Sequence, residues 1–172
     1  RIAEVATDLE ISYTNLAYIV RIHEIMHWLF QWKEKPNSTP REYEYIEESM
    51  ANYMTLLWID WLVKHIDDCP VEKFLLDKTI SDLKTDAITF MEQQPEAYAV
   101  AVLLYDKCNP FDNDNVLPFI NWCFQKNKIK NENRTALVKN LREFYNNLRE
   151  LDKNPENYST NDIITWYKAL FA

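Results

Sequence analysis

Apolar side chains recur every three or four residues along most of the chain, which is the spacing that buries one face of an α-helix. Thr7 or Asp8 is the expected N-cap of the first long helix, because short polar side chains accept hydrogen bonds from a first turn. This helix is predicted to run to about Trp32. Its predicted buried face consists of Leu16, Ile19, Val20, His23, Met26, His27 and Phe30.

A second long helix is predicted after the break "EKPNSTP" at 34–40. Ser38 or Thr39 can cap it, and Pro40 suits its first turn, where a backbone N–H would lack a partner. The helix should reach about His65. Its predicted apolar face consists of Ile46, Met50, Tyr53, Met54, Leu57 and Trp61. The tryptophans expected to anchor the core between the two helices are Trp28, Trp32, Trp58 and Trp61.

The remainder of the chain also follows the helical pattern. Ser159 and Asp162 form a capping box at the start of the last helix. The other predicted helical regions are 71–94, which admits an interruption, 95–107, 114–126 and 133–151. The sequence therefore predicts an all-α fold, with a single helical domain of about six to eight helices. This domain covers residues 1–172, as a helix pair at 1–66 and a helical remainder at 67–172.

The chain contains no glycine, although glycine supplies the positive φ that tight hairpin turns require. Its absence disfavours hairpins and agrees with a helical fold. Asparagine is the second choice for the left-handed residue that ends many helices, and we expect it to act so in "DKCNP", "QKNKIKN" and "DKNP". The first residue is Arg1 rather than methionine, so we expect a piece of a longer protein, with any β-sheet upstream of Arg1.

Charge and cysteine content exclude some partners. The net charge is −8, and no basic stripe is present to displace counterions from a nucleic acid, so no nucleic-acid partner is expected. The longest apolar runs, such as "YAVAVLLY" at 98–105, are too short to span a bilayer, and no membrane partner is expected. Cys69, Cys108 and Cys123 form no C-x-x-C pattern and are expected to be reduced thiols, which favours a cytoplasmic location.

The sequence "HEIMH" at 23–27 contains two of the three histidines. Residues four apart on a helix lie one turn apart on the same side, so His23 and His27 can bind one ion. Zinc suits two imidazole nitrogens at tetrahedral angles. Glu24 would project beside the ion and accept a proton from a zinc-bound water. The alternative interpretation is that both histidines are core residues of an apolar helical face.

A catalytic zinc site needs a third protein ligand, and two adjacent glutamates on the second helix are candidates. Glu48 is preferred because Asn52 then lies one turn further along the same face and Tyr45 lies close before it. Glu47 is the rival, although it has Ala51 in place of that polar neighbour. Either glutamate could instead be a solvated carboxylate near an acidic helix start.

These two segments resemble the gluzincin metallopeptidases, in which an H-E-x-x-H helix is followed by a second helix with E-x-x-A-D/N. The resemblance covers about residues 16–56, and the "ESMAN" form looks most like the repressor-cleaving zinc proteases of mobile elements. It implies a Zn²⁺ cofactor and a peptide or protein substrate. The ligands it implies are His23, His27 and Glu48, with Glu24 as the base and Asn52 as an acceptor behind a zinc-binding histidine. Arg21 departs from the uncharged residue usual in the family.

The resemblance leaves two requirements of a peptidase open. Gluzincins carry a β-sheet before the first metal helix, and the 22 residues before His23 are predicted helical. An oxyanion donor is also needed. Tyr45 and Tyr43 are candidates by proximity, whereas His65 is excluded because 17 residues of helix would separate it from Glu48 by roughly 25 Å. The leading hypothesis is a zinc-dependent peptide hydrolase, and the alternative is a non-enzymatic helical interaction domain with an inert motif or a structural metal.

Overall fold

The structure is a computed structural model, and it describes residues 1–29, 40–94, 96–107 and 134–170. Over these ranges the chain folds into α-helices and contains no β-strand, so the predicted all-α single domain is confirmed. The helices are α1 (Ile2–Asp8), α2 (Tyr13–Leu29), α3 (Pro40–Lys64), α4 (Pro70–Leu76), α5 (Leu83–Glu92), α6 (Glu96–Lys107), α8 (Arg134–Lys153) and α9 (Thr160–Leu170). Short 3₁₀ turns occur at Ile66–Asp68 and Pro155–Asn157.

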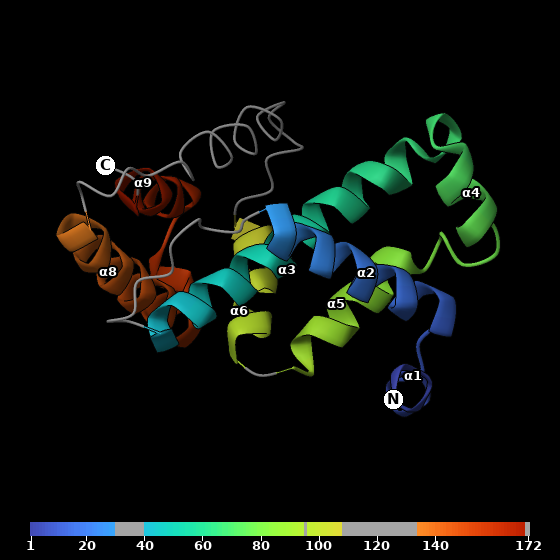
Figure 1. The fold of residues 1–172 in the computed structure, drawn as a ribbon, viewed down its shortest axis with the longest axis horizontal. Helices are drawn as coiled ribbons and strands as arrows, with labels where there is room; N and C mark the ends of the chain where they lie inside the picture. Colours follow the sequence, from blue (N-terminus) through green and yellow to red (C-terminus); the bar gives the residue numbers. More distant parts are fainter. Residues whose placement is uncertain (30–39, 95, 108–133, 171–172) are drawn as a thin grey trace.

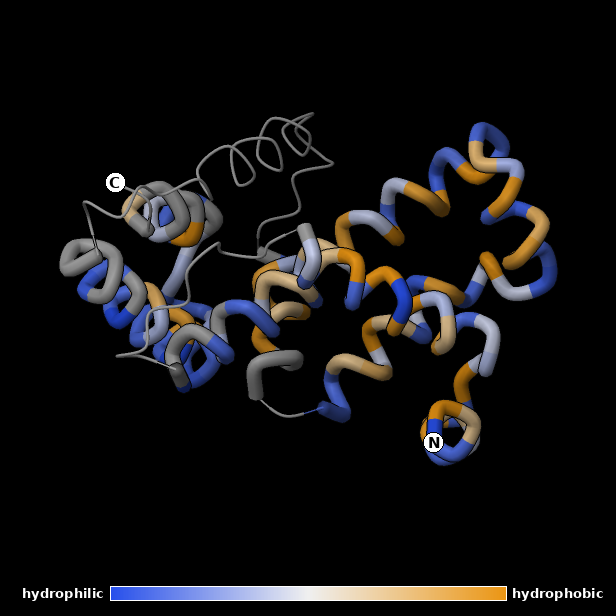
Figure 2. Tube along the Cα trace, viewed as in Figure 1, coloured by the Kyte–Doolittle hydropathy of each residue, from blue (hydrophilic) through white to orange (hydrophobic). Residues whose placement is uncertain are grey.

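The long helix α3 forms the centre of the molecule (Figure 1). It contacts α2, α5, α6 and α8, while α8 with α9 lies at one end of the molecule and α1 with α4 at the other. All residues at 49–57 are buried, so this part of α3 is enclosed on every side. Figure 2 shows apolar positions where the central helices meet. A helix enclosed in this way is apolar nearly all round, because it has no solvent face.

The two hydroxyl groups of Ser49 and Thr55 in this buried stretch are satisfied within the helix. The hydroxyl of Ser49 donates a hydrogen bond to the backbone oxygen of Tyr45 at 2.7 Å, and the hydroxyl of Thr55 donates to that of Ala51 at 2.7 Å. Such bonds to the carbonyl four residues earlier remove the cost of burying a hydroxyl group. The core can therefore contain α3 without further polar partners at these positions.

The start of the chain differs from the prediction of one helix capped by Thr7 or Asp8. Asp8 ends α1, and α2 begins only at Tyr13. Between them Glu10 has φ 55°, in the left-handed region. The N–H of Ile11 donates to the oxygen of Ala6 and the N–H of Glu10 to that of Thr7, which is a Schellman ending.

Ser12 is the residue that caps α2. Its hydroxyl accepts a hydrogen bond from the N–H of Asn15 at 3.3 Å. The expectation that asparagine supplies the left-handed helix ends is wrong for Asn154, which follows α8 with φ −139°. The other two asparagine breaks lie outside the described residues.

Most other predicted boundaries agree with the structure. Pro40 begins α3, and the helix predicted at 71–94 is interrupted between α4 and α5. The capping box is confirmed: the N–H of Ser159 donates to the carboxylate of Asp162 at 2.8 Å, and the N–H of Asp162 donates to the hydroxyl of Ser159 at 3.3 Å. The caps predicted at Ser38 or Thr39 and the helix at 114–126 fall outside the described residues.

Buried polar contacts fix α2 and α3 against α5. Asn15 of α2 donates to the carboxylate of Asp86 at 2.7 Å, with both side chains buried. Asp60 of α3 accepts hydrogen bonds from Lys84 at 2.8 Å and from Lys64 at 3.0 Å. Because buried polar groups need their partners, these contacts hold the two long helices in one relative position.

The tryptophans divide into packed and exposed residues. The indole N–H of Trp58 on α3 donates to the hydroxyl of Tyr18 on α2 at 3.0 Å, so Trp58 does connect the two long helices. Trp61 packs against Trp58 at a ring-centroid distance of 5.3 Å. Trp28 is 70% exposed, so its predicted place in the core is wrong. Trp32 is outside the described residues.

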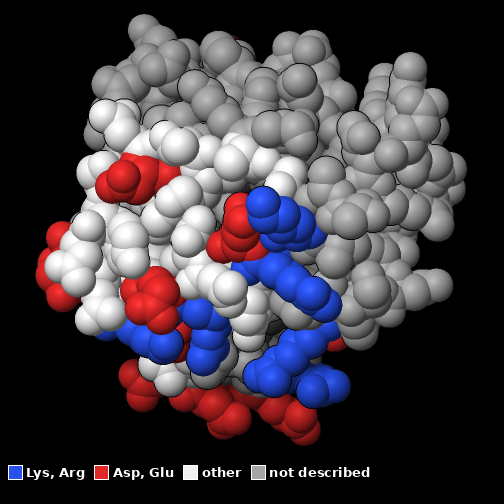
Figure 3. Space-filling view, turned by 90° about the vertical axis from the view of Figure 1, so that its left-hand side faces the viewer, with Lys and Arg blue, Asp and Glu red and all other residues white. Residues whose placement is uncertain are grey.

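Among the described residues, no helix is long and apolar enough to cross a membrane. Figure 3 shows acidic and basic side chains next to one another on the face at the left end of Figure 1, and α8 carries pairs such as Lys153 with Glu150 at 2.8 Å. Cys69 is a free, half-buried thiol, and the other two cysteines lie outside the described part of the chain.

Candidate metal centre

The candidate centre lies between α2 and α3. His23 and His27 stand one turn apart on α2, on the side that also carries the buried residues Ile19 and Met26. Both histidine side chains face α3, because each lies within 3.4 Å of the carboxylate of Glu48. Glu48 lies in the first half of α3, just before the fully buried stretch.

Three ligand atoms converge at this crossing. The Nε2 atoms of His23 and His27 are 2.9 Å apart. One carboxylate oxygen of Glu48 lies 3.4 Å from Nε2 of His23, and the other lies 3.3 Å from Nε2 of His27. The three residues are thus brought together as a group that could hold a metal ion.

The spacing of these atoms suits a tetrahedral ion. With zinc–ligand bonds of about 2.0–2.2 Å, two tetrahedral ligand atoms lie roughly 3.3 Å apart. Each contact of Glu48, at 3.4 and 3.3 Å, has about this length, and the two contacts are made by different oxygens of its carboxylate. The histidine pair at 2.9 Å needs only a small opening. One possible ligand atom of each of the three residues lies within 4.8 Å of the other two.

Glu47 lies on the opposite edge of the His27 ring. One of its carboxylate oxygens is 3.6 Å from Nδ1 of His27, while Glu48 faces Nε2. These two carboxylates raise the pKa of His27 to about 9, since both favour the protonated imidazole, Glu47 more strongly. Without a metal, His27 therefore carries a proton near neutral pH, and a metal would have to displace it.

The three side chains of the candidate centre differ in their exposure to solvent. The side chain of His23 is 8% exposed, that of His27 19% and that of Glu48 34%. One side of the group is therefore set into the protein and the other faces outward. A catalytic zinc site keeps one position open for a non-protein ligand, and the outward side of Glu48 is where such a position is expected.

Glu24 and Asn52 lie beside the group in different environments. Glu24 follows His23 on α2 and its side chain is exposed. Asn52 is fully buried, and its amide N–H₂ donates to the backbone oxygen of Glu48 at 2.9 Å. Because a carbonyl only accepts, this bond fixes the orientation of the amide and leaves its oxygen as the free acceptor. The roles of both residues stay predictions.

The predicted oxyanion donors are less well placed. The described contacts of Tyr45 are with α8, where its ring meets that of Tyr145 edge-on at 5.1 Å and Arg149 lies over it at 5.9 Å. Burial raises the pKa of Tyr45 to about 12. These contacts favour a packing role. The side chain of Tyr43 is outside the described ones.

His65 directly follows the C-terminal end of α3, whereas Glu48 lies in its first half. This position agrees with the prediction that His65 is too far from Glu48 to act as an oxyanion donor. Its ring stacks on that of Trp61 at 4.7 Å, and its Nδ1 is 2.8 Å from the backbone oxygen of Trp61. Both contacts are local to the end of α3. His65 is therefore a packing residue.

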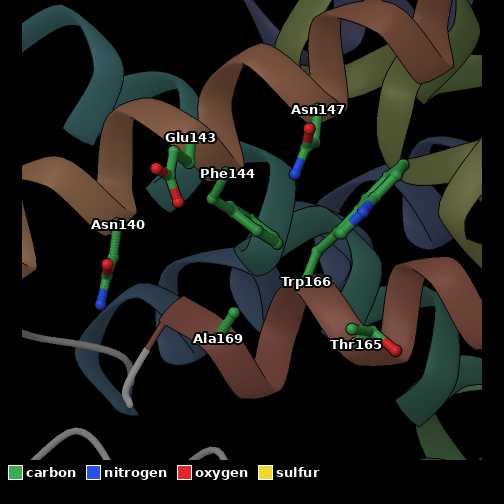
Figure 4. Close-up of a pocket in the computed structure, with 7 residues that line it drawn as sticks. All are labelled: Asn140, Glu143, Phe144, Asn147, Thr165, Trp166 and Ala169. Atoms are coloured by element: carbon green, nitrogen blue, oxygen red, sulfur yellow. The ribbon is translucent and has the colours of Figure 1, made fainter.

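A separate hollow lies between α8 and α9 (Figure 4). Its volume is about 60 Å³, which is room for roughly two water molecules at their liquid volume. The side chains that line it are Asn140, Glu143, Phe144, Asn147, Thr165, Trp166 and Ala169. With one carboxylate and no histidine or cysteine among them, these residues do not form a metal site.

The chain matches no protein-family model, no curated protein and no solved structure in comparisons with each. The resemblance of "HEIMH" and "ESMAN" to gluzincins therefore stays a prediction based on those residues.

Proposed function

We propose that this protein is a zinc-dependent peptide hydrolase of gluzincin type, or the helical part of one. The observation that carries the proposal is the convergence of two imidazole nitrogens and one carboxylate within 4.8 Å, with Glu24 directly after one of the histidines. A convergent set of three such ligands with an outward side is the donor set of catalytic zinc sites.

Each residue has a distinct task in this proposal. His23, His27 and Glu48 hold the ion, and Glu48 also reduces its net charge. Zinc in this position supplies an acidified water and a polarised substrate carbonyl. Glu24 accepts the proton of the attacking water and delivers it to the leaving amine, which requires a solvent-facing carboxylate beside the ligands. The exposed side chain of Glu24 supports that assignment.

A second candidate function is a non-enzymatic helical interaction domain with a structural metal. The observation that favours it is the lack of a strand in the part of the chain that the structure describes. Peptidases of the gluzincin type pair an extended substrate with the edge of a sheet. A domain without such an edge can still hold an ion between α2 and α3.

The test is peptide cleavage by the Glu24→Gln variant. The zinc-loaded protein is incubated with a pool of synthetic peptides, and products are identified by mass spectrometry. We expect the variant to retain zinc and to cleave about 100- to 10,000-fold more slowly, because the amide cannot accept the proton. Glu44→Gln is the matched control, since Glu44 is exposed on α3, and it should cleave as the wild type does.

Two results would contradict the proposal. Cleavage that persists in Glu24→Gln would mean that another group is the base. A zinc-loaded wild type that cleaves no peptide of the pool would favour the interaction domain.

A further inference from the structure

The adjacent residues Glu47 and Glu48 face different edges of one imidazole ring. Neighbouring residues on a helix point roughly 100° apart, as follows from 3.6 residues per turn. In α3 this divergence sets the carboxylate of Glu48 at 3.3 Å from Nε2 of His27 and that of Glu47 at 3.6 Å from Nδ1. The ring of His27 therefore lies between two carboxylates of the same helix.

The two nitrogens of a metal-binding imidazole have different tasks. One binds the ion, and the other normally donates its N–H to an acceptor that fixes the tautomer and the orientation of the ring. For His27, Nε2 faces His23 and Glu48, so Nδ1 is the nitrogen that needs an acceptor. The distance of 3.6 Å to Glu47 is slightly longer than a hydrogen bond, and a small side-chain rotation would close it.

We propose that Glu47 is a positioning residue, which accepts the Nδ1–H of His27 and thereby directs Nε2 toward the metal. The inference rests on the proposed metal centre. The environment favours this role: the side chain of Glu47 is only 14% exposed, so solvent screens its interaction with His27 weakly. Glu47 is then neither a rival ligand nor one of the solvated carboxylates of the helix start.

This assignment also changes what is expected of Asn52. The resemblance to gluzincins implies that Asn52 supports one of the two histidines. A single Nδ1–H donates fully to one acceptor, and Glu47 fills that place for His27. His23 is therefore the histidine left for Asn52 to support.

The test compares zinc affinity in four proteins by competition with a chelator: wild type, Glu47→Ala, Glu47→Gln and the exposed control Glu44→Ala. All four proteins are titrated at several pH values, and their affinities are compared at the highest of these, where protons compete least with the ion. We expect Glu47→Ala to bind zinc about 10- to 100-fold more weakly. Glu47→Gln should recover most of the loss, because the amide oxygen still accepts, and Glu44→Ala should equal the wild type.

A second measurement reports the tautomer directly. In the zinc-loaded wild type, ¹⁵N NMR of the His27 ring should show a protonated Nδ1 and a metal-bound Nε2. In Glu47→Ala the Nδ1–H signal should exchange faster with water or disappear. Equal affinities and unchanged ring signals would overturn the role of Glu47 while leaving the metal centre intact. A wild type that binds no zinc would overturn the metal centre itself, and this inference with it.

Discussion

Asn52 has an unusual position for an amide side chain. It is fully buried, and its side-chain oxygen has no hydrogen-bond partner among the described residues. A buried acceptor without a donor costs about 1–3 kcal/mol. The cost would be recovered if a histidine ring turned its N–H to this oxygen while binding a cation. The role of Asn52 behind a zinc-binding histidine stays a prediction.

We therefore predict that Asn52→Ala weakens zinc binding about 10- to 100-fold without unfolding the domain. Asn52→Asp should bind zinc at least as well as the wild type, because a charged acceptor forms a stronger hydrogen bond with the ring N–H. A competition titration against a chelator measures both, with circular dichroism as the check on folding. Equal affinity in all three proteins would reduce Asn52 to a packing residue.

Asp60 gives the fold a pH dependence that is separate from the centre. Burial alone would raise the pKa of this carboxyl, but the hydrogen bonds from Lys84 and Lys64 outweigh burial and hold it below the usual 3.8. At pH values between the lowered pKa of Asp60 and 3.8, this carboxyl binds more protons in the unfolded chain than in the folded one. The stabilisation is therefore fully present above 3.8 and is lost as the pH falls through the folded pKa.

We predict that the free energy of unfolding of the wild type falls on going from neutral to strongly acidic pH, and that Asp60→Asn shows a smaller fall. Urea unfolding of both proteins at the two pH values measures this. The variant should also be less stable at neutral pH, since two lysines lose their carboxylate. An identical pH dependence in wild type and variant would show that Asp60 does not contribute.

At the scale of the helices, the sequence predicts those boundaries that are set by local chemistry. Pro40 and the pair Ser159 and Asp162 define helix starts through their own side chains, and the structure agrees. The break between α1 and α2 escapes prediction because a glutamate, Glu10, takes the left-handed position. Neither glycine nor proline marks that break.

The sequence predicts the arrangement of side chains where α2 crosses α3 only in part. One-turn spacing within α2 brings His23 and His27 together whatever the remaining fold does. Which nitrogen faces which glutamate depends on how α2 and α3 cross, and packing of the whole core sets that angle. The sequence therefore identifies Glu48 and Glu47 as candidates without separating their positions around His27. The exposure of Trp28 is likewise a tertiary result, since the large apolar surface of a tryptophan alone favours a core position.

The left-handed conformation of Glu10, between α1 and α2, leads to a prediction about stability. Glu10→Gly should stabilise the protein by about 1 kcal/mol, because a side chain at positive φ clashes with the backbone and glycine has none. The control Glu10→Ala keeps that clash and should leave stability near that of the wild type. The measurement is the urea midpoint of the three proteins. A glycine variant no more stable than the alanine variant would contradict a strained ending of α1.

For the whole molecule, α3 connects the candidate centre to the core. Its first half carries Glu47 and Glu48, and its middle is enclosed by the other helices. A metal held by ligands from α2 and α3 would therefore tie two central helices together rather than a peripheral loop. The same arrangement implies that the ligands are preorganised by folding, which a mobile site could not provide.

The decisive measurement is the zinc content of the whole chain. The protein is stripped with a chelator, incubated with zinc, freed of unbound metal and analysed for zinc by elemental analysis, beside His27→Ala and the control Glu44→Ala. We predict close to one zinc per chain in the wild type and the control, and little in His27→Ala, which retains only two of the three ligands. A folded wild type that remains metal-free after this treatment would contradict the metal centre and the hydrolase proposed from it.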